Sequence, residues 1–220
     1  MRPTGKMMTG RPEMGRPGLG RSFRRSAGLL PGLVLGATAA CSPLRTFDAV
    51  VPKDGGVRLV VRGAAFGPDP RQRLDVYAPK DTPANGRSRP VIVFFYGGSW
   101  SSGTRAGYSF VGRALAARGF VVAIPDYRLV PQVRFPAFLR DNAAAVRWVR
   151  GHIAASGGDP DRLVLAGHSA GAYDAAMLAL DPRWLGADRA AVRGWAGLAD
   201  RGEVRVGSAH DTLPTLVSKG

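Results

Sequence analysis

A serine between two glycines is the residue of this sequence best suited to nucleophilic chemistry. The motif Gly-His-Ser-Ala-Gly at 167–171 follows an apolar run and precedes a helix-prone stretch, 172–180. A strand, a Gly-x-Ser-x-Gly turn and a helix in that order form a nucleophile elbow. Such a tight turn excludes side chains at the glycines and lifts the serine hydroxyl clear of the backbone. Ser169 is therefore a candidate nucleophile.

Attack by a serine on a carbonyl carbon creates an oxyanion that needs backbone N–H donors. In elbows of this kind one donor belongs to the residue after the serine, here Ala170. The second should come from a glycine-rich turn after an earlier strand, and the apolar run 91–95 leads directly into Gly97 and Gly98. The sequence thus predicts an oxyanion hole made by the amides of Gly97, Gly98 and Ala170. The alternative, that the two glycines only form a tight turn, stays open.

The elements that must position these residues alternate between strand and helix. Apolar runs without polar alternation are typical of strands in a parallel sheet that is covered on both faces. We expect strands at 57–61, 74–78, 91–95, 120–124, 163–166 and 192–198, and helices at 108–118, 137–155 and 172–180. The fold class is therefore α/β, with a mostly parallel sheet between two layers of helices. At 220 residues, one domain with a sizeable core is expected.

Several motifs in order give the chain a resemblance to a known superfamily. They are Asp75-Val76-Tyr77, Tyr96-Gly97-Gly98-Ser99-Trp100, Asp126-Tyr127-Arg128-Leu129, Phe135-Pro136, Asp141 and the serine motif. This set resembles the α/β-hydrolases, and within them the esterase/lipase group related to hormone-sensitive lipase and kynurenine formamidase. The resemblance implies a three-layer sandwich and hydrolysis of a small carboxylic ester through an acyl-enzyme, with no cofactor. Tyr96 stands where the group usually has histidine, which backbone donors should tolerate.

The resemblance also implies that a triad acid and then a histidine follow the serine. Only 51 residues follow Ser169, and His210 is the single histidine among them. His210 is thus the candidate base, with Asp200 or Asp211 to orient it. The competing interpretation is a catalytically inactive, truncated lipoprotein that lacks the acid and the histidine. The tail 200–220 shows no strand pattern, so we expect truncation or a shifted reading frame and an unpaired sheet edge.

The other carboxylates near these motifs are expected to be structural. Asp126 ends a strand and should pair with Arg128 or cap the following loop. Asp141 should serve as a hydrogen-bonding group on its helix. Asp174 and Asp181 lie on or just after the helix that follows the serine, so they should point away from the site.

The remaining histidines and the charge exclude other classes of function. His168 should point away from the serine hydroxyl, and His152 should lie solvated at a helix end. No histidine or cysteine cluster has metal-ligand spacing, so no metal is expected. The net charge of +15 comes partly from the first 26 residues, and the other basic residues are scattered. No nucleic-acid partner is expected.

The N-terminal region predicts export. A basic stretch precedes the apolar segment 27–40, which is too short to span a bilayer comfortably and ends at Cys41, the only cysteine. Small residues before a cysteine resemble the lipobox of bacterial lipoproteins. We therefore expect an export signal at 1–41, lipidation of Cys41, a partial hydrolase domain at 42–199 and a lipid anchor at the bacterial cell envelope, on its periplasmic or surface face. A twin-arginine signal at Arg24-Arg25 and a buried free cysteine remain alternatives.

Overall fold

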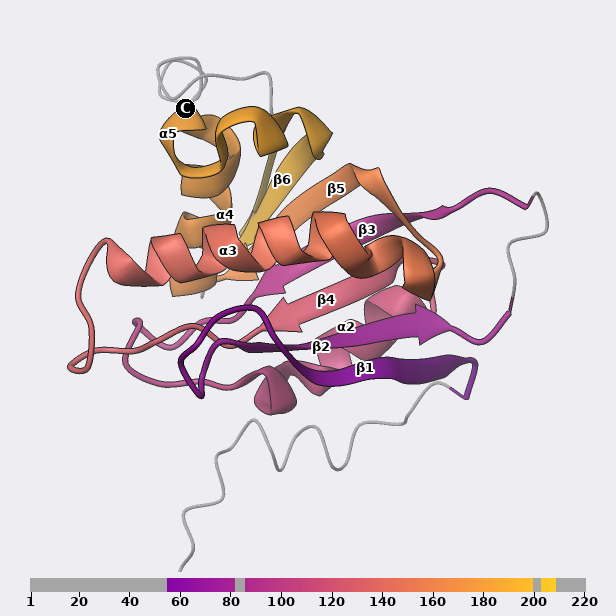
Figure 1. Ribbon diagram of the computed structural model, residues 1–220, viewed down its shortest axis with the longest axis horizontal. Helices are drawn as coiled ribbons and strands as arrows, with labels where there is room; N and C mark the ends of the chain where they lie inside the picture. Colours follow the sequence, from indigo (N-terminus) through magenta and orange to yellow (C-terminus); the bar gives the residue numbers. More distant parts are fainter. Residues whose placement is uncertain (1–54, 82–85, 200–202, 209–220) are drawn as a thin grey trace, which may run out of the picture. The chain divides into compact units, whose positions relative to one another are not determined.

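The sheet at the centre of the fold has seven strands. A computed structural model describes residues 55–81, 86–199 and 203–208. The strand order is β1-β2-β4-β3-β5-β6-β7. The bounds of the strands are β1 Val57–Ala65, β2 Arg73–Pro79, β3 Arg89–Phe95, β4 Val121–Pro125, β5 Gly158–His168, β6 Val192–Leu198 and β7 Val204–Ser208. β4, β3, β5 and β6 are mutually parallel, whereas β1, β2 and β7 pair antiparallel at the two edges (Figure 1).

Helices cover both faces of this sheet, as the sequence predicts. One face packs α3, α4 and α5 against one core cluster, and the other packs α2 and the short helix η1 against a second cluster. The bounds are η1 Arg105–Tyr108, α2 Ser109–Ala116, α3 Ala137–His152, η2 Ile153–Ser156, α4 Ala170–Leu180, α5 Pro182–Leu185 and η3 Gly186–Ala191. Side chains of β3 alternate between the clusters, with Val91 and Val93 in the first and Ile92 and Phe94 in the second. Burial on both faces explains why this strand is apolar throughout.

The C-terminal edge differs from its prediction. We expected no strand after residue 200 and an unpaired edge at β6, but β7 pairs antiparallel with β6 from Leu198↔Val204 to Gly194↔Ser208. Val204 and Val206 are 63% and 72% exposed, so burial of these side chains does not hold the strand. Backbone hydrogen bonds to β6 hold β7 in place. A short strand held in this way needs little apolar pattern in its sequence, so sequence analysis does not detect it.

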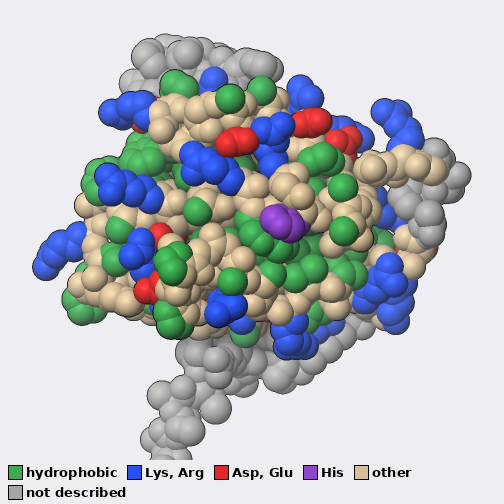
Figure 2. Space-filling model, in the orientation of Figure 1, with side chains coloured by type: hydrophobic (Ala, Val, Ile, Leu, Met, Phe, Trp, Pro, Cys, Tyr) green, Lys and Arg blue, Asp and Glu red, His purple; other side chains and the backbone are tan. Residues whose placement is uncertain are grey.

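Charged side chains are spread over the face drawn in Figure 2, where the visible acidic side chains lie beside basic ones. One such pairing in the described part of the chain is that of Asp188 with Arg147 and Arg150. Within the described ranges, no helix is both long and apolar enough to cross a membrane. The predictions for Cys41 and Arg24-Arg25 lie outside the described residues.

Candidate active site

Ser169 lies in a strained turn between β5 and α4. Its backbone has φ 51° and ψ −115°, a conformation that residues other than glycine rarely adopt. Its amide donates to the carbonyl of Leu198 on β6, at 2.8 Å. A Cβ at Gly167 would lie 2.1 Å from the carbonyl oxygen of Gly171, so the turn closes only with glycine there. This geometry agrees with the nucleophile elbow that the sequence predicts.

The glycine turn after β3 lies against this elbow. A Cβ at Gly171 would lie 2.0 Å from the carbonyl oxygen of Phe95, because the first turn of α4 packs directly on the end of β3. A Cβ at Gly97 would lie 3.1 Å from the Cβ of Ser169. Residues 72 positions apart are thereby brought together, with Ala170 at the first position of α4. The candidate nucleophile and the candidate oxyanion turn form one site.

The candidate oxyanion turn, residues 97–100, has an unusual backbone conformation. Gly98 has φ 128°, and it is followed by two residues other than glycine in the left-handed region, Ser99 at 51° and Trp100 at 55°. The carbonyl of Gly98 accepts hydrogen bonds from the amides of Ser101 and Ser102, at 3.0 and 3.1 Å. Strain of this kind persists only where the surroundings over-determine the conformation. Two polar clusters, one at each end of the turn, hold it in this conformation.

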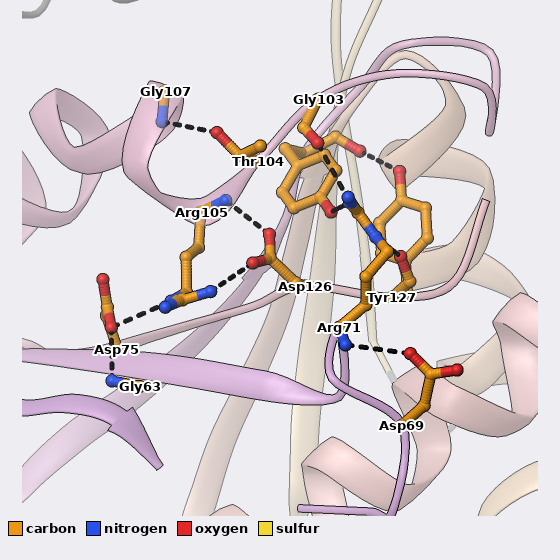
Figure 3. A network of polar contacts seen from close by, with 11 residues as sticks. Gly63, Asp69, Arg71, Asp75, Gly103, Thr104, Arg105, Gly107, Asp126 and Tyr127 are labelled. Carbon is orange, nitrogen blue, oxygen red and sulfur yellow. Dashed lines mark hydrogen bonds and ion pairs between the residues drawn. The ribbon is translucent and has the colours of Figure 1, made fainter. Parts of the chain in front are cut away.

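The first cluster is built on Arg71 and holds the start of the turn. Figure 3 shows its guanidinium between the oxyanion turn and the loop after β4. It donates to the hydroxyl of Tyr96 at 2.8 Å, the carbonyl of Tyr127 at 2.9 Å and the carbonyl of Gly103 at 3.0 Å. The hydroxyl of Tyr127 donates to the carbonyl of Tyr96 at 2.7 Å, and the two rings stack. Burial raises the pKa of both tyrosines, so both stay neutral hydrogen-bonding groups.

The second cluster holds the end of the turn and was missed by sequence reasoning. Asp174 was expected to point away from the site, but its carboxylate is fully buried and accepts from the indole Nε1–H of Trp100 at 3.1 Å. It also accepts from the amide nitrogen of Asn142 on α3, at 2.9 Å. Burial raises the pKa of Asp174 to about 7. An aspartate in an otherwise apolar helix was the only sequence signal for this cluster.

Asp126 and Asp141 have structural roles, although one predicted partner was wrong. Asp126 pairs with the guanidinium and backbone amide of Arg105, not with Arg128 (Figure 3). Arg128 pairs instead with Asp141, at 2.8 Å, and Gln72 donates to the same carboxylate. Each carboxylate is paired with an arginine, so neither is free to orient a histidine as a triad acid. Proximity in sequence suggested Arg128 as the partner of Asp126, but η1 lies against the end of β4 and brings Arg105 to this carboxylate.

The histidines in the described part of the chain are also engaged. His168 Nδ1 lies 3.0 Å from the hydroxyl of Tyr108, on the α2 side of the sheet. His152 is exposed at the end of α3, where its ring stacks on Trp148. Within 55–81, 86–199 and 203–208, no three histidine, cysteine or carboxylate side chains gather as metal ligands. The predicted base His210 and its partners Asp200 and Asp211 lie outside these ranges.

Comparisons with known proteins identify a family and several relatives of this chain. The family described as BD-FAE matches residues 74–188, which include the elbow and the oxyanion turn. The chain is 42% identical over 117 residues to the probable isoprenylcysteine alpha-carbonyl methylesterase ICMEL1 of Arabidopsis thaliana, covering 53% of this chain and 24% of that protein. It is 39% identical over 128 residues to esterase LipC of Mycobacterium tuberculosis, covering 56% and 31%.

Among solved structures, the fold resembles EstE1, a thermophilic carboxylesterase cloned from a metagenomic library. The TM-score is 0.57 at 28% identity, and the match covers 70% of this chain and 50% of that one. The chain thus spans about a quarter to a third of the length of these curated relatives and half of this structure. The part matched by the family, residues 74–188, carries the serine and glycine motifs.

Proposed function

The chain belongs to the BD-FAE family, in the esterase/lipase group of the α/β-hydrolases, and we propose that it hydrolyses small carboxylic esters with Ser169 as nucleophile. The observation that carries the proposal is the contact between the strained elbow and the glycine turn. A Cβ at Gly97 would lie 3.1 Å from that of Ser169. A reacting carbonyl beside the serine would therefore also lie beside the turn's backbone.

The proposed reaction has two steps. The Ser169 hydroxyl attacks the ester carbonyl and gives its proton to a base, while the amides of Gly97, Gly98 and Ala170 hold the oxyanion. Collapse of this intermediate releases the alcohol and leaves an acyl-enzyme. Water then attacks the acyl group, a second oxyanion forms and collapses, and the carboxylic acid and free Ser169 are released.

His210 is the candidate base within this chain, oriented by Asp200 or Asp211. The competing proposal is a hydrolase-fold protein that keeps the elbow but has no working base. The two differ in one outcome, because a serine without a base is a poor nucleophile at neutral pH. An active chain requires both Ser169 and His210, whereas an inactive one turns over no ester at all.

Hydrolysis of p-nitrophenyl acetate by the full chain tests these proposals. We expect turnover that is abolished in Ser169→Ala and in His210→Ala. Ser88→Ala is the matched control, since Ser88 is exposed at the opposite end of β3 and should leave turnover unchanged. Folded protein without turnover would favour the inactive alternative. Turnover that survives Ser169→Ala would overturn the assignment of the nucleophile.

We also propose that Cys41 carries a lipid that anchors the chain at a bacterial cell envelope. The support is the sequence pattern alone, small residues before a single cysteine after an apolar segment. Palmitate labelling of cells that express the chain should give a labelled band that is lost in Cys41→Ser. Equal labelling of the two proteins would contradict the proposal.

A further inference from the structure

We infer that Asp174 is a positioning residue for the oxyanion turn. Its carboxylate fixes the indole of Trp100, and with it the turn 97–100, against the helix that begins after Ser169. The inference rests on the proposed role of that turn in holding the oxyanion. Neither the serine motif nor the glycine motif includes Asp174.

The geometry places one buried carboxylate between three elements. Asp174 lies on α4, five residues after Ser169, and accepts from Trp100 Nε1 at 3.1 Å through one oxygen and 3.3 Å through the other. Asn142 on α3 donates to the second oxygen, at 2.9 Å. Asp174 and Asn142 both have an exposed fraction of 0%. A single group therefore connects the turn, the helix of the nucleophile and the long helix beside it.

Trp100 needs such an anchor because its backbone is strained. With φ 55° it follows Ser99 at φ 51°, and residues other than glycine adopt this conformation only at an energetic cost. The indole stacks on Phe138 and makes an edge contact with Tyr173, which orients the ring. The bond to Asp174 is the polar contact that fixes where the ring's N–H points.

The charge state of Asp174 decides how strong this anchor is. Burial raises its pKa to about 7, while the two donors act in the opposite direction by favouring the charged form. Ionised, the carboxylate accepts two charge-assisted bonds, which are stronger than neutral ones. Protonated, it must also find an acceptor for its own proton. The buried Oδ1 of Asn142 has no partner in the described part of the chain, and after rotation of the side-chain amide it could accept a hydrogen bond from the protonated carboxyl group.

Other charged groups do not compensate this carboxylate. No cation pairs with Asp174 among the described residues. The buried Tyr127 interacts electrostatically with Asp174, and burial together with that carboxylate raises the pKa of the tyrosine, so it stays neutral. The elements packed against α4 carry other charged or titratable side chains, and each of these either has another partner or is exposed. They are Arg89, Arg140, Asp141, Arg147, Arg150, His152, Asp159, Asp161, Arg162, His168, Arg183 and Arg193.

Indole N–H resonances in ¹H–¹⁵N NMR spectra of the full chain test the anchor without relying on activity. The chain has four tryptophans, and Trp100→Phe identifies the signal of interest. We expect that signal to shift with pH with a midpoint near 7, and to stay constant over the same range in Asp174→Asn. A Trp100 signal that does not titrate, or that titrates equally in Asp174→Asn, would overturn the inference.

Labelling of Ser169 by a fluorophosphonate links the anchor to the site. At pH 8 we expect Asp174→Asn and Trp100→Phe each to slow labelling by about fivefold, with no further loss in the double variant, because both remove the same contact. Thermal unfolding of each variant separates this loss from loss of fold. Independent, multiplying losses would contradict a shared role. If the unaltered chain is not labelled at all, the proposed function fails, and the NMR titration alone decides the inference.

Discussion

The middle of the sheet and its C-terminal edge are held in place by different forces. Between β3 and β5, backbone approaches leave no room for a single added methyl group at Gly167 or Gly171, and buried polar clusters close both ends of the oxyanion turn. At the edge, β7 is held to β6 by backbone pairing, while Val204 and Val206 face solvent. Ser169 is therefore fixed by sterically demanding backbone contacts, and we expect the edge to tolerate substitution.

The largest expected effect comes from filling the close approach at the elbow. In Gly171→Ala the new Cβ would lie 2.0 Å from the carbonyl oxygen of Phe95, a backbone atom that cannot move aside. We expect the free energy of unfolding to fall by about 3 kcal/mol or more. Gly151→Ala on α3 is the control, because nothing lies within 4 Å of its Cβ, and a small gain of about 0.5 kcal/mol is expected. Similar urea midpoints for the two variants would break the comparison.

The buried carboxylate should give the interior a pH-dependent stability. Because the pKa of Asp174 is about 7 when folded against an ordinary 3.8, the folded chain holds a proton that the unfolded chain has released between these values. Its contribution to stability is therefore full below pH 3.8 and is lost as pH rises to about 7. Relative to Asp174→Asn, the unaltered chain should lose roughly 4 kcal/mol of unfolding free energy across that range. Urea unfolding at pH 4 and 8 measures most of this loss, and parallel pH profiles would contradict the expectation.

A matched pair of truncations compares the two regions directly. Leu165 on β5 is fully buried, so Leu165→Ala should lower the free energy of unfolding by about 3 kcal/mol. Val206 on β7 is 72% exposed, so Val206→Ala should change it by less than about 0.5 kcal/mol. Thermal unfolding of both variants checks this, and a large loss in Val206→Ala would mean that the edge is covered by other parts of the protein.

The smallest effect concerns the backbone strain at Ser169, the proposed nucleophile. Glycine adopts φ 51° without the penalty that Ser169 carries, so Ser169→Gly should raise the free energy of unfolding by about 1 kcal/mol, part of the gain being offset by entropy of the unfolded chain. Ser169→Ala keeps the Cβ and should show no such gain. Calorimetry on both variants distinguishes them, and equal melting temperatures would argue against strain.

The sequence predicts the interior well because burial and close backbone contacts there restrict which residue types fit. Apolar runs buried on two faces identify β3 and β4, and the glycines of the serine motif reflect contacts that no side chain could occupy. The contact between Gly97 and Ser169 follows once both turns end neighbouring parallel strands. For these residues, local pattern and tertiary position agree.

Features that depend on distant partners were not predictable. Asp174 meets Trp100 across 74 positions, and Arg71 meets Tyr127 across 56, so neither spacing carries a signal. Asp126 has Arg128 nearby in sequence but pairs with Arg105 because η1 folds back over the end of β4. Strand β7 relies on backbone pairing, which any residue except proline can supply.

Mass spectrometry of the full chain after reaction with a fluorophosphonate tests the central claim most directly. We predict a single covalent adduct, located by peptide mapping on Ser169, that is absent from Ser169→Ala and from heat-unfolded protein. An adduct on another residue, or the same adduct in unfolded protein, would contradict the claim that the elbow makes this serine a nucleophile.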